Sequence, residues 1–331
     1  MKIAFPIVML IRVKLSYEKR KEKKVLPNLV FNQKSKAVFF IILAGVLWGT
    51  SFPIIKVGLA TIDPFAFVFW RFLVASVTLL VVMQLLGKLN FKIADKKLLV
   101  FLGIANGSGY LLQYVGMNYT TTAKAALFIN LSAMWVALLS PRLLGEGFSR
   151  KKIAGVLFGL AGIIFVSTNL DFSGLSGGEL IGDVMLLVSG VTWALFMIYN
   201  KKMITGSTSA VFQSMTWILV LTLLSIVPFT VFAGARLFDL SGMAWAAIAY
   251  TAIVCWVIPY YLWLEGLKHL SALVSSVLLL SEVVVAVVAS VAVLNEPVTV
   301  FSTIGAFFII IAIMLVSVRD KQLAQERKPE D

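Results

Sequence analysis

The sequence contains very little of the chemistry that enzymes and metal sites depend on. Its 331 residues include one cysteine, Cys255, and one histidine, His269. A single cysteine cannot form an intrachain disulfide, and neither residue belongs to a metal-ligand spacing. Nucleophilic catalysis needs a nucleophile beside a base, and no such pair, paired-aspartate cluster or ATP-binding loop is visible. The sequence therefore predicts no enzyme activity, no catalytic residue, no metal site and no cofactor.

Charged residues are also scarce, whereas apolar residues are in excess. Only 14% of the residues are charged and 60% are apolar, and the mean hydropathy is +0.96, whereas soluble domains are about 45–50% apolar. Apolar runs of roughly 20 residues, long enough to span a bilayer, recur along the chain. They predict an all-α, polytopic membrane protein with ten transmembrane helices. The predicted spans cover residues 37–59, 64–87, 97–118, 122–144, 151–168, 179–200, 209–233, 242–266, 270–294 and 299–318.

The basic residues are distributed unevenly among the connections between these spans. With ten spans both termini lie on one side, and 25 of the 29 lysines and arginines fall on that side. The positive-inside rule then places both termini in the cytoplasm, in a multi-pass protein of the cell membrane. The formal charge of +13 is therefore a topology signal, and it predicts the lipid bilayer as a partner rather than nucleic acid.

The connections between the spans are too short to hold a soluble domain. Residues 1–36 are predicted to form a basic, disordered cytoplasmic tail, and residues 319–331 a charged cytoplasmic tail. A tail that binds anionic lipid headgroups is the alternative for residues 1–36.

The chain contains an internal repeat. When the sequence is shifted by 150 residues, Gly116–Glu146 aligns with Gly266–Glu296 without a gap. A second match pairs GVLW at Gly45 with GVTW at Gly190, near the starts of the two halves. The repeat predicts two five-helix units, residues 37–168 and residues 179–318. Because five is an odd number, the second unit inserts upside down relative to the first, as in alternating-access carriers with a site near the midplane.

Several segments resemble a known family. They are WGTSFPIIK (Trp48–Lys56), RFLVA (Arg71–Ala75), the stretch Ala125–Val166 and its echo Leu279–Val316. The pattern resembles the drug/metabolite transporter superfamily, specifically its ten-helix EamA-type members. One departure is that Ala133 and Val283 stand where the family often has a proline.

The resemblance implies a secondary active transporter, often an exporter, of small metabolites such as amino acids or related polar or amphipathic compounds. The first, third, fourth, sixth, eighth and ninth spans would line a central cavity, and the carrier would be a monomer or a weak homo-oligomer. A facilitated exchanger or uniporter, a multidrug-type efflux carrier and a non-transporting membrane sensor or scaffold are the alternatives.

Glu282 is the residue that stands out within the predicted spans. It is the one ionisable residue between Val277 and Val291, and a charge at this depth costs roughly 3 kcal/mol on insertion scales. At helical spacing it shares a small, partly polar face with Ser275 and Ala286. Either Glu282 is a proton or cation site that couples transport, or it is a structural residue paired with neighbouring polar groups.

Other polar and aromatic residues of the predicted spans are candidates for binding the substrate. The amides suit hydrogen bonds to a polar solute, the lysine suits an anionic group, and the aromatic rings suit a flat or apolar solute. The alternatives are helix–helix hydrogen bonds, snorkelling to the headgroups and interfacial anchoring. Besides Glu282, the candidates are Asn106, Gln113, Lys124, Asn130, Trp48, Trp193, Ser275 and Tyr260.

Three further charged residues are predicted to form structural ion pairs. Arg71 lies near the outer end of the second span, and Glu296 ends the ninth span on the same side, so the two could pair. Glu146 ends the fourth span and is predicted to anchor helix ends. A substrate-binding Arg71 is the less favoured alternative, because the second span is not among those expected to line the cavity.

Overall fold

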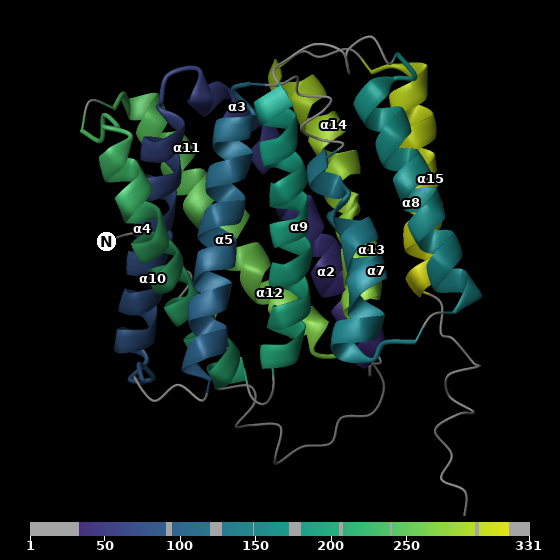
Figure 1. Ribbon diagram of the computed structural model, residues 1–331, viewed down its shortest axis with the longest axis horizontal. Coiled ribbons are helices and arrows are strands. Elements are labelled where there is room, and N and C mark those ends of the chain that lie inside the picture. Colours follow the sequence, from purple (N-terminus) through teal and green to yellow (C-terminus); the bar gives the residue numbers. More distant parts are fainter. Residues whose placement is uncertain are drawn as a thin grey trace, which may run out of the picture.

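The computed structural model describes residues 33–90, 95–119, 128–147, 149–171, 180–204, 208–238, 240–294 and 298–317. Every regular element among these residues is a helix, and the helices run side by side along roughly one direction (Figure 1). Within this part of the chain, eight helices are long and apolar enough to cross a membrane, and Phe128–Leu144 is a shorter apolar helix. The predicted all-α, polytopic membrane fold is therefore confirmed.

Helices occupy all ten predicted span positions. The first five positions hold α2 (Gln33–Gly49) with α3 (Ser51–Leu59), α4 (Pro64–Leu85), α5 (Lys96–Gly116), α7 (Ser132–Leu144) and α8 (Arg150–Thr168). The second five hold α9 (Leu180–Met203), α10 (Thr208–Phe232), α11 (Gly242–Ala252) with η2 (Ile253–Val257) and α12 (Ile258–Leu267), α13 (Ala272–Leu279) with α14 (Ser281–Leu294), and α15 (Val300–Ser317).

Local sequence signals set many of the helix ends. The Asp63 side chain accepts hydrogen bonds from the first turn of α4, which Pro64 opens, and Ser149, Ser241 and Ser271 cap other helices in the same way. Such caps satisfy backbone N–H groups that have no partner within the helix. The first helix, however, begins at Gln33, so the last residues of the predicted 1–36 tail are helical. Lysines do not stop a helix that extends beyond the apolar layer.

The first, fourth, eighth and ninth spans are not continuous α-helices. Turns interrupt them at Thr50, Leu131 and Leu280, and a π-helical stretch, η2, interrupts the eighth. Leu131 and Leu280 lie within one residue of each other in the 150-residue repeat. The breaks form although Ala133 and Val283 replace the expected prolines. Irregular backbone is tolerated at membrane depth only where protein or a wet cavity surrounds it.

The packing of the helices repeats between the two halves. α5 of the first half packs against α9 and α10 of the second half. The counterpart of α5, the span from α11 to α12, packs in the same way against α2 and α4 of the first half. α7 packs against α9, as α14 packs against α2. Two pairs join equivalent spans: α4 with α10 at the left of Figure 1 and α8 with α15 at the right. The sequence repeat is therefore also a repeat in the pattern of helix contacts.

Two glycines at matching positions of the two halves allow close contacts between helices. A β-carbon at Gly45 would lie 3.3 Å from the Leu279 carbonyl oxygen, and one at Gly190 would lie 3.5 Å from the Ile129 carbonyl oxygen. Ile129 and Leu279 are themselves 150 residues apart. Small residues let helix backbones approach closely in membranes, so the first and sixth spans lie directly against the broken spans.

Polar contacts join helix ends at the lower side of the bundle in Figure 1. The Glu146 carboxylate, after α7, accepts hydrogen bonds from the backbone N–H groups of Ala272 (2.7 Å) and Leu273 (3.3 Å) at the start of α13. The Lys201 ammonium, at the end of α9, donates to the Leu267 carbonyl at 2.6 Å. An acid at a helix N-terminus and a base at a C-terminus both complement the helix dipole. Glu146 thus ties the first half to the second.

The glycine contact between the first and ninth spans gives a stability prediction. A β-carbon at Gly49 would lie 2.6 Å from the Glu282 carbonyl oxygen, whereas one at Gly242 would meet nothing within 4 Å. Overpacking of this kind costs about 1–3 kcal/mol. Gly49→Ala is therefore expected to lower the thermal midpoint of the purified protein, and Gly242→Ala to leave it unchanged or slightly raised. Equal midpoints for the two variants would contradict this packing.

Candidate functional site

A cavity of about 110 Å³ lies where the four interruptions meet. Trp48 and Ser51 flank the break at Thr50, Asn130 and Ser132 flank the break at Leu131, and further wall residues come from η2 and from the α13–α14 break. A buried water needs on the order of 10–15 Å³, so the cavity is large enough for several waters or a small solute. The six spans that the resemblance implied all contribute to the wall.

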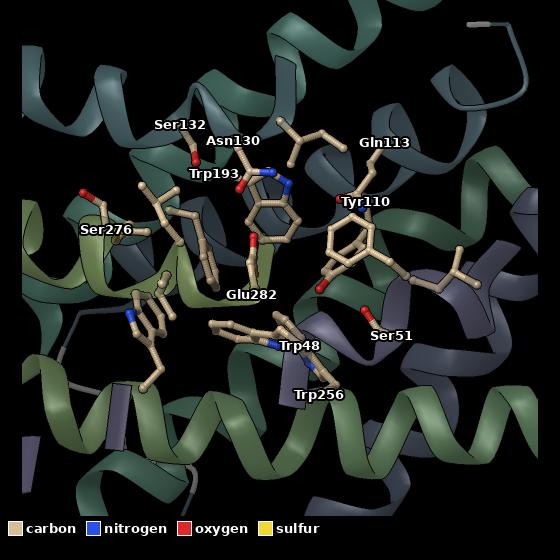
Figure 2. A pocket seen from close by; sticks show the side chains of 18 of the residues that line it. Trp48, Ser51, Tyr110, Gln113, Asn130, Ser132, Trp193, Trp256, Ser276 and Glu282 are labelled. Carbon is tan, nitrogen blue, oxygen red and sulfur yellow. The ribbon is translucent and has the colours of Figure 1, made fainter. Parts of the chain in front are cut away.

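Glu282 projects into the middle of this cavity. Figure 2 shows its carboxylate between Asn130 and Trp193 on one side and Trp48 on the other. Glu282 lies in the first turn of α14, which begins only because the helix breaks at Leu280. The positive end of the helix dipole favours a carboxylate there. The side chain is half-buried and makes no hydrogen bond or ion pair within the described part of the chain.

Arg71 is the other charged residue of the wall, contrary to the expectation for the second span. Its side chain is only 1% exposed. It donates from Nη1 to the Tyr114 hydroxyl at 2.5 Å and from Nη2 to the Cys255 carbonyl at 3.4 Å, and its guanidinium lies 4.8 Å from the Tyr110 ring centroid. α4 packs against η2, which brings this long side chain within reach of the cavity.

Uncharged polar groups complete the polar part of the wall. Gln113 of α5 and Asn130 contribute amides, and Ser51, Ser132 and Ser276 contribute hydroxyls (Figure 2). These groups can each both donate and accept hydrogen bonds. The polar lining is therefore spread over spans from both halves of the chain rather than gathered on one helix.

Aromatic rings form most of the remaining wall. Trp48 packs 6.1 Å from Trp256 and 6.2 Å from Trp263, and Trp193 lies 4.7 Å from Tyr110, all between ring centroids. All five line the cavity. Pockets for small molecules combine such an apolar lining with a few fixed polar groups, so the arrangement suits a small amphipathic solute.

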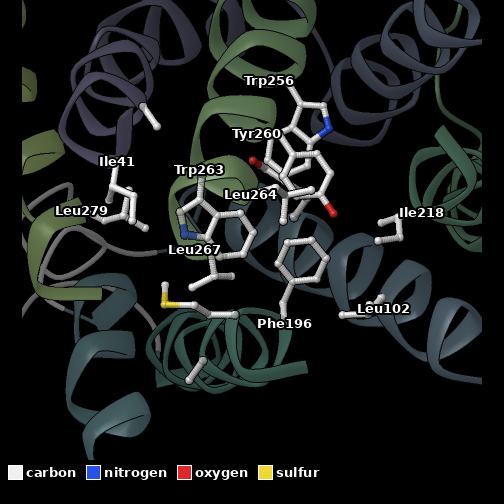
Figure 3. Packing of buried hydrophobic residues seen from close by; sticks show 14 of the residues in the cluster. Ile41, Leu102, Phe196, Ile218, Trp256, Tyr260, Trp263, Leu264, Leu267 and Leu279 are labelled. Carbon is white, nitrogen blue, oxygen red and sulfur yellow. The ribbon is translucent and has the colours of Figure 1, made fainter. Parts of the chain in front are cut away.

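Two of the predicted binding residues are buried among aromatic rings instead of lining the cavity. Tyr260 is fully buried, donates to the Asn200 amide oxygen at 3.1 Å and stacks 5.8 Å from Trp263 (Figure 3). Ser275 is also fully buried and accepts a hydrogen bond from the Trp263 indole at 2.9 Å. Neither is part of the wall. The break at Leu280 changes the helical register, so Ser276 faces the cavity instead of Ser275.

The comparisons with known proteins agree with this architecture. A model of the EamA-like transporter family matches residues 35–168 and 180–318. The chain belongs to the EamA-like transporter family. It is therefore a membrane transporter, and as a transporter of this family it acts on a small-molecule substrate in a lipid bilayer.

Relatives of this EamA-like transporter match along most of its length. An uncharacterized transporter of Archaeoglobus fulgidus is 29% identical over 87% of this chain and 99% of its own. The uncharacterized transporter YyaM of Bacillus subtilis is 26% identical over 84% of this chain and 93% of its own. A crystal structure that covers 88% of this chain and 99% of its own has a TM-score of 0.71 at 18% identity, which shows a shared fold.

Other predicted site residues of the EamA-like transporter lie away from the wall or outside the described residues. Asn106 is fully buried one turn below Tyr110 and donates to the Thr222 hydroxyl of α10 at 3.0 Å, so it joins two helices. Lys124 and Glu296 fall outside the described residues, and so does any pair between Glu296 and Arg71.

Several wall residues were missed by the sequence reasoning. Tyr110 lies one helical turn from Gln113 on the same face of α5, so its spacing was an available signal. Ser132 occupies the position of Glu282 in the 150-residue repeat, so the repeat was a signal for it. Ser51 and Ser276 had no signal, because each lies near a helix break that the sequence does not mark. No group of histidine, cysteine, aspartate and glutamate residues that could hold a metal occurs in the described ranges.

The wall assignment predicts which cysteine variants react with a small polar thiol reagent. Ser132 lines the cavity, whereas Ser140, two turns later on α7, is fully buried. The native Cys255 is buried and gives little background. Because the hydrated thiolate is the reactive form, Ser132→Cys is expected to react much faster than Ser140→Cys in the folded protein. Equal labelling rates under native conditions would place the cavity elsewhere.

Proposed function

We propose that this EamA-like transporter is a secondary active transporter that exports small polar or amphipathic metabolites, such as amino acids, by alternating access. Protons drive the export through Glu282. The observation that carries the proposal is the position of Glu282, which is the one acidic residue of the cavity wall and lies at the break between α13 and α14. Ionisable groups at membrane depth commonly serve such relays.

The arrangement of the two halves supports alternating access. In carriers built from inverted repeats, one unit rocks against the other around a central site. Here the matching contacts of Gly45 and Gly190 let both units pack in the same way around the cavity. The buried Tyr260 and Ser275, together with the Glu146 contact to Ala272, support a state in which the path toward the lower side of Figure 1 is closed.

The topology is also part of the proposal. The two units are residues 37–168 and 179–318, inserted in opposite senses, and the charged segments 1–32 and 319–331 lie in the cytoplasm. The lower side in Figure 1 is then the cytoplasmic side of the cell membrane. The protein acts as a monomer or a weak homo-oligomer, and it has no enzymatic activity.

A facilitated exchanger or uniporter is the second candidate. The wall contains Arg71 as well as Glu282, so it offers charged groups that can bind the solute itself without a bound coupling ion. In that case a solute gradient alone would drive the cycle, and Glu282 would bind the solute rather than a proton.

Replacing the central carboxylate tests the coupling. We expect Glu282→Gln to abolish the stimulation of transport by a pH gradient while leaving exchange of the solute, because an amide cannot carry a proton between the two sides. Arg71 and Tyr110 are the other titratable groups of the wall, and they remain in the variant. The measurement is solute flux in liposomes with and without a pH gradient.

The solute for this measurement comes from comparing metabolites inside and outside cells in which the protein is overproduced or deleted. Glu265→Gln is the matched control, because this acid pairs with Lys268 at 3.1 Å and is not part of the wall. It is expected to keep the full response to the gradient. An unchanged response in Glu282→Gln would remove this residue as the coupling site and favour the uniporter.

A further inference from the structure

Arg71 is a buried cation without a carboxylate partner. Within the described residues its polar contacts are the Tyr114 hydroxyl and the Cys255 carbonyl, and its other neighbours are the rings of Tyr110 (4.8 Å) and Trp256 (5.9 Å). Glu282 faces the same cavity but does not lie within ion-pair distance. A buried charge is costly unless an opposite charge compensates it, so the Arg71 side of the cavity favours an anion.

The buried polar atoms of the wall residues that lack a hydrogen-bond partner are all hydrogen-bond donors. The side-chain atoms Nε of Arg71 and Nε1 of Trp48 and Trp256 are buried and without a hydrogen-bond partner among the described residues. All three belong to wall residues, and all three are donors only. Leaving a buried donor unpaired costs about 1–3 kcal/mol. These atoms are buried and are not exposed to the open space of the cavity, so they show that this part of the wall is rich in donors, while the preference for a carboxylate comes from the charge of Arg71.

We infer that the cavity binds a small solute with a carboxylate on an apolar body, and that Arg71 selects the carboxylate. A guanidinium matches the two oxygens of a carboxylate in a planar, bidentate fashion. The apolar body then lies among the rings of Trp48, Trp193 and Trp263, which line the rest of the cavity. This inference rests on the proposed function, since it names the solute class of the same site.

Tyr114 is the positioning residue for Arg71. It is fully buried, is not part of the wall, and holds the guanidinium through its hydroxyl, while its ring packs 5.6 Å from Phe67 of α4. Removing the hydroxyl keeps the ring and its packing. Tyr114→Phe is therefore expected to weaken the selection of carboxylates without unfolding the protein.

Binding to the purified protein in detergent tests the inference without requiring transport. Trp48, Trp193, Trp256 and Trp263 all line the cavity, so a bound solute is expected to change the intrinsic tryptophan fluorescence. The probes are two matched pairs: L-phenylalanine with L-phenylalaninamide, and 3-phenylpropanoate with 3-phenylpropanamide. Each pair differs only in whether it carries a carboxylate. The second pair has no amine, so Glu282 cannot dominate its preference through an ion pair.

In the unmodified protein, 3-phenylpropanoate is expected to bind about tenfold or more tightly than its amide, because a hydrogen bond to a charged group contributes about 1.5–3 kcal/mol. Arg71→Gln is expected to reduce the carboxylate-to-amide preference of both pairs by a similar factor. Arg71→Lys, which keeps the charge, is expected to restore part of it, and Tyr114→Phe to give an intermediate preference. Lys151→Gln removes an exposed charge at the start of α8 and is expected to change neither ratio.

Two results would overturn the inference. One is a folded Arg71→Gln or Tyr114→Phe protein with the carboxylate preference of the unmodified protein. The other is an unmodified protein to which neither carboxylate binds at millimolar concentration, or which prefers the uncharged amide of the second pair.

The outcome is separable from that of the proposed function. Carboxylate-selective binding without solute flux in liposomes supports the inference and contradicts the carrier. Flux of an identified solute without carboxylate selectivity contradicts the inference and leaves the carrier standing.

Discussion

A backbone that crosses lipid must satisfy each of its N–H and C=O groups, and this constraint decides where the cavity can form. The helix breaks at Thr50, Leu131 and Leu280 would be costly against lipid. They are stable here because they face one another across a shared, partly polar space, together with the π-helical stretch Ile253–Val257. The cavity and the irregular backbone therefore depend on each other.

The same helix breaks also determine which polar side chains face the cavity. Glu282 is tolerable in an apolar helix because the interruption at Leu280 makes it the first turn of a new helix, with the positive helix end beside it. Ser276 and Ser132 turn toward the cavity for the same reason, since each follows or precedes a break. An unbroken helix would present one continuous face, with Ser275 in line with Glu282.

The two charged wall residues are held in different ways, and this difference suits different roles. Arg71 is fixed by a tyrosine hydroxyl, a backbone carbonyl and two aromatic rings, so its position is determined before a solute arrives. Glu282 is half-buried, and within the described chain it has no comparable restraint. A fixed cation is suited to recognition, whereas a carboxylate free to exchange partners is suited to proton movement.

The sequence by itself determined the helical membrane fold, the positions of the helices along the chain and the identity of Glu282, Gln113, Trp48 and Trp193 as residues to examine, because hydropathy, length and spacing are local properties. The tertiary structure alone decided that Arg71 lines the cavity and that Asn106, Ser275 and Tyr260 do not. These placements depend on where the helices break and on which helices pack against one another. Both are set by contacts between residues far apart in the chain, and no local pattern records them.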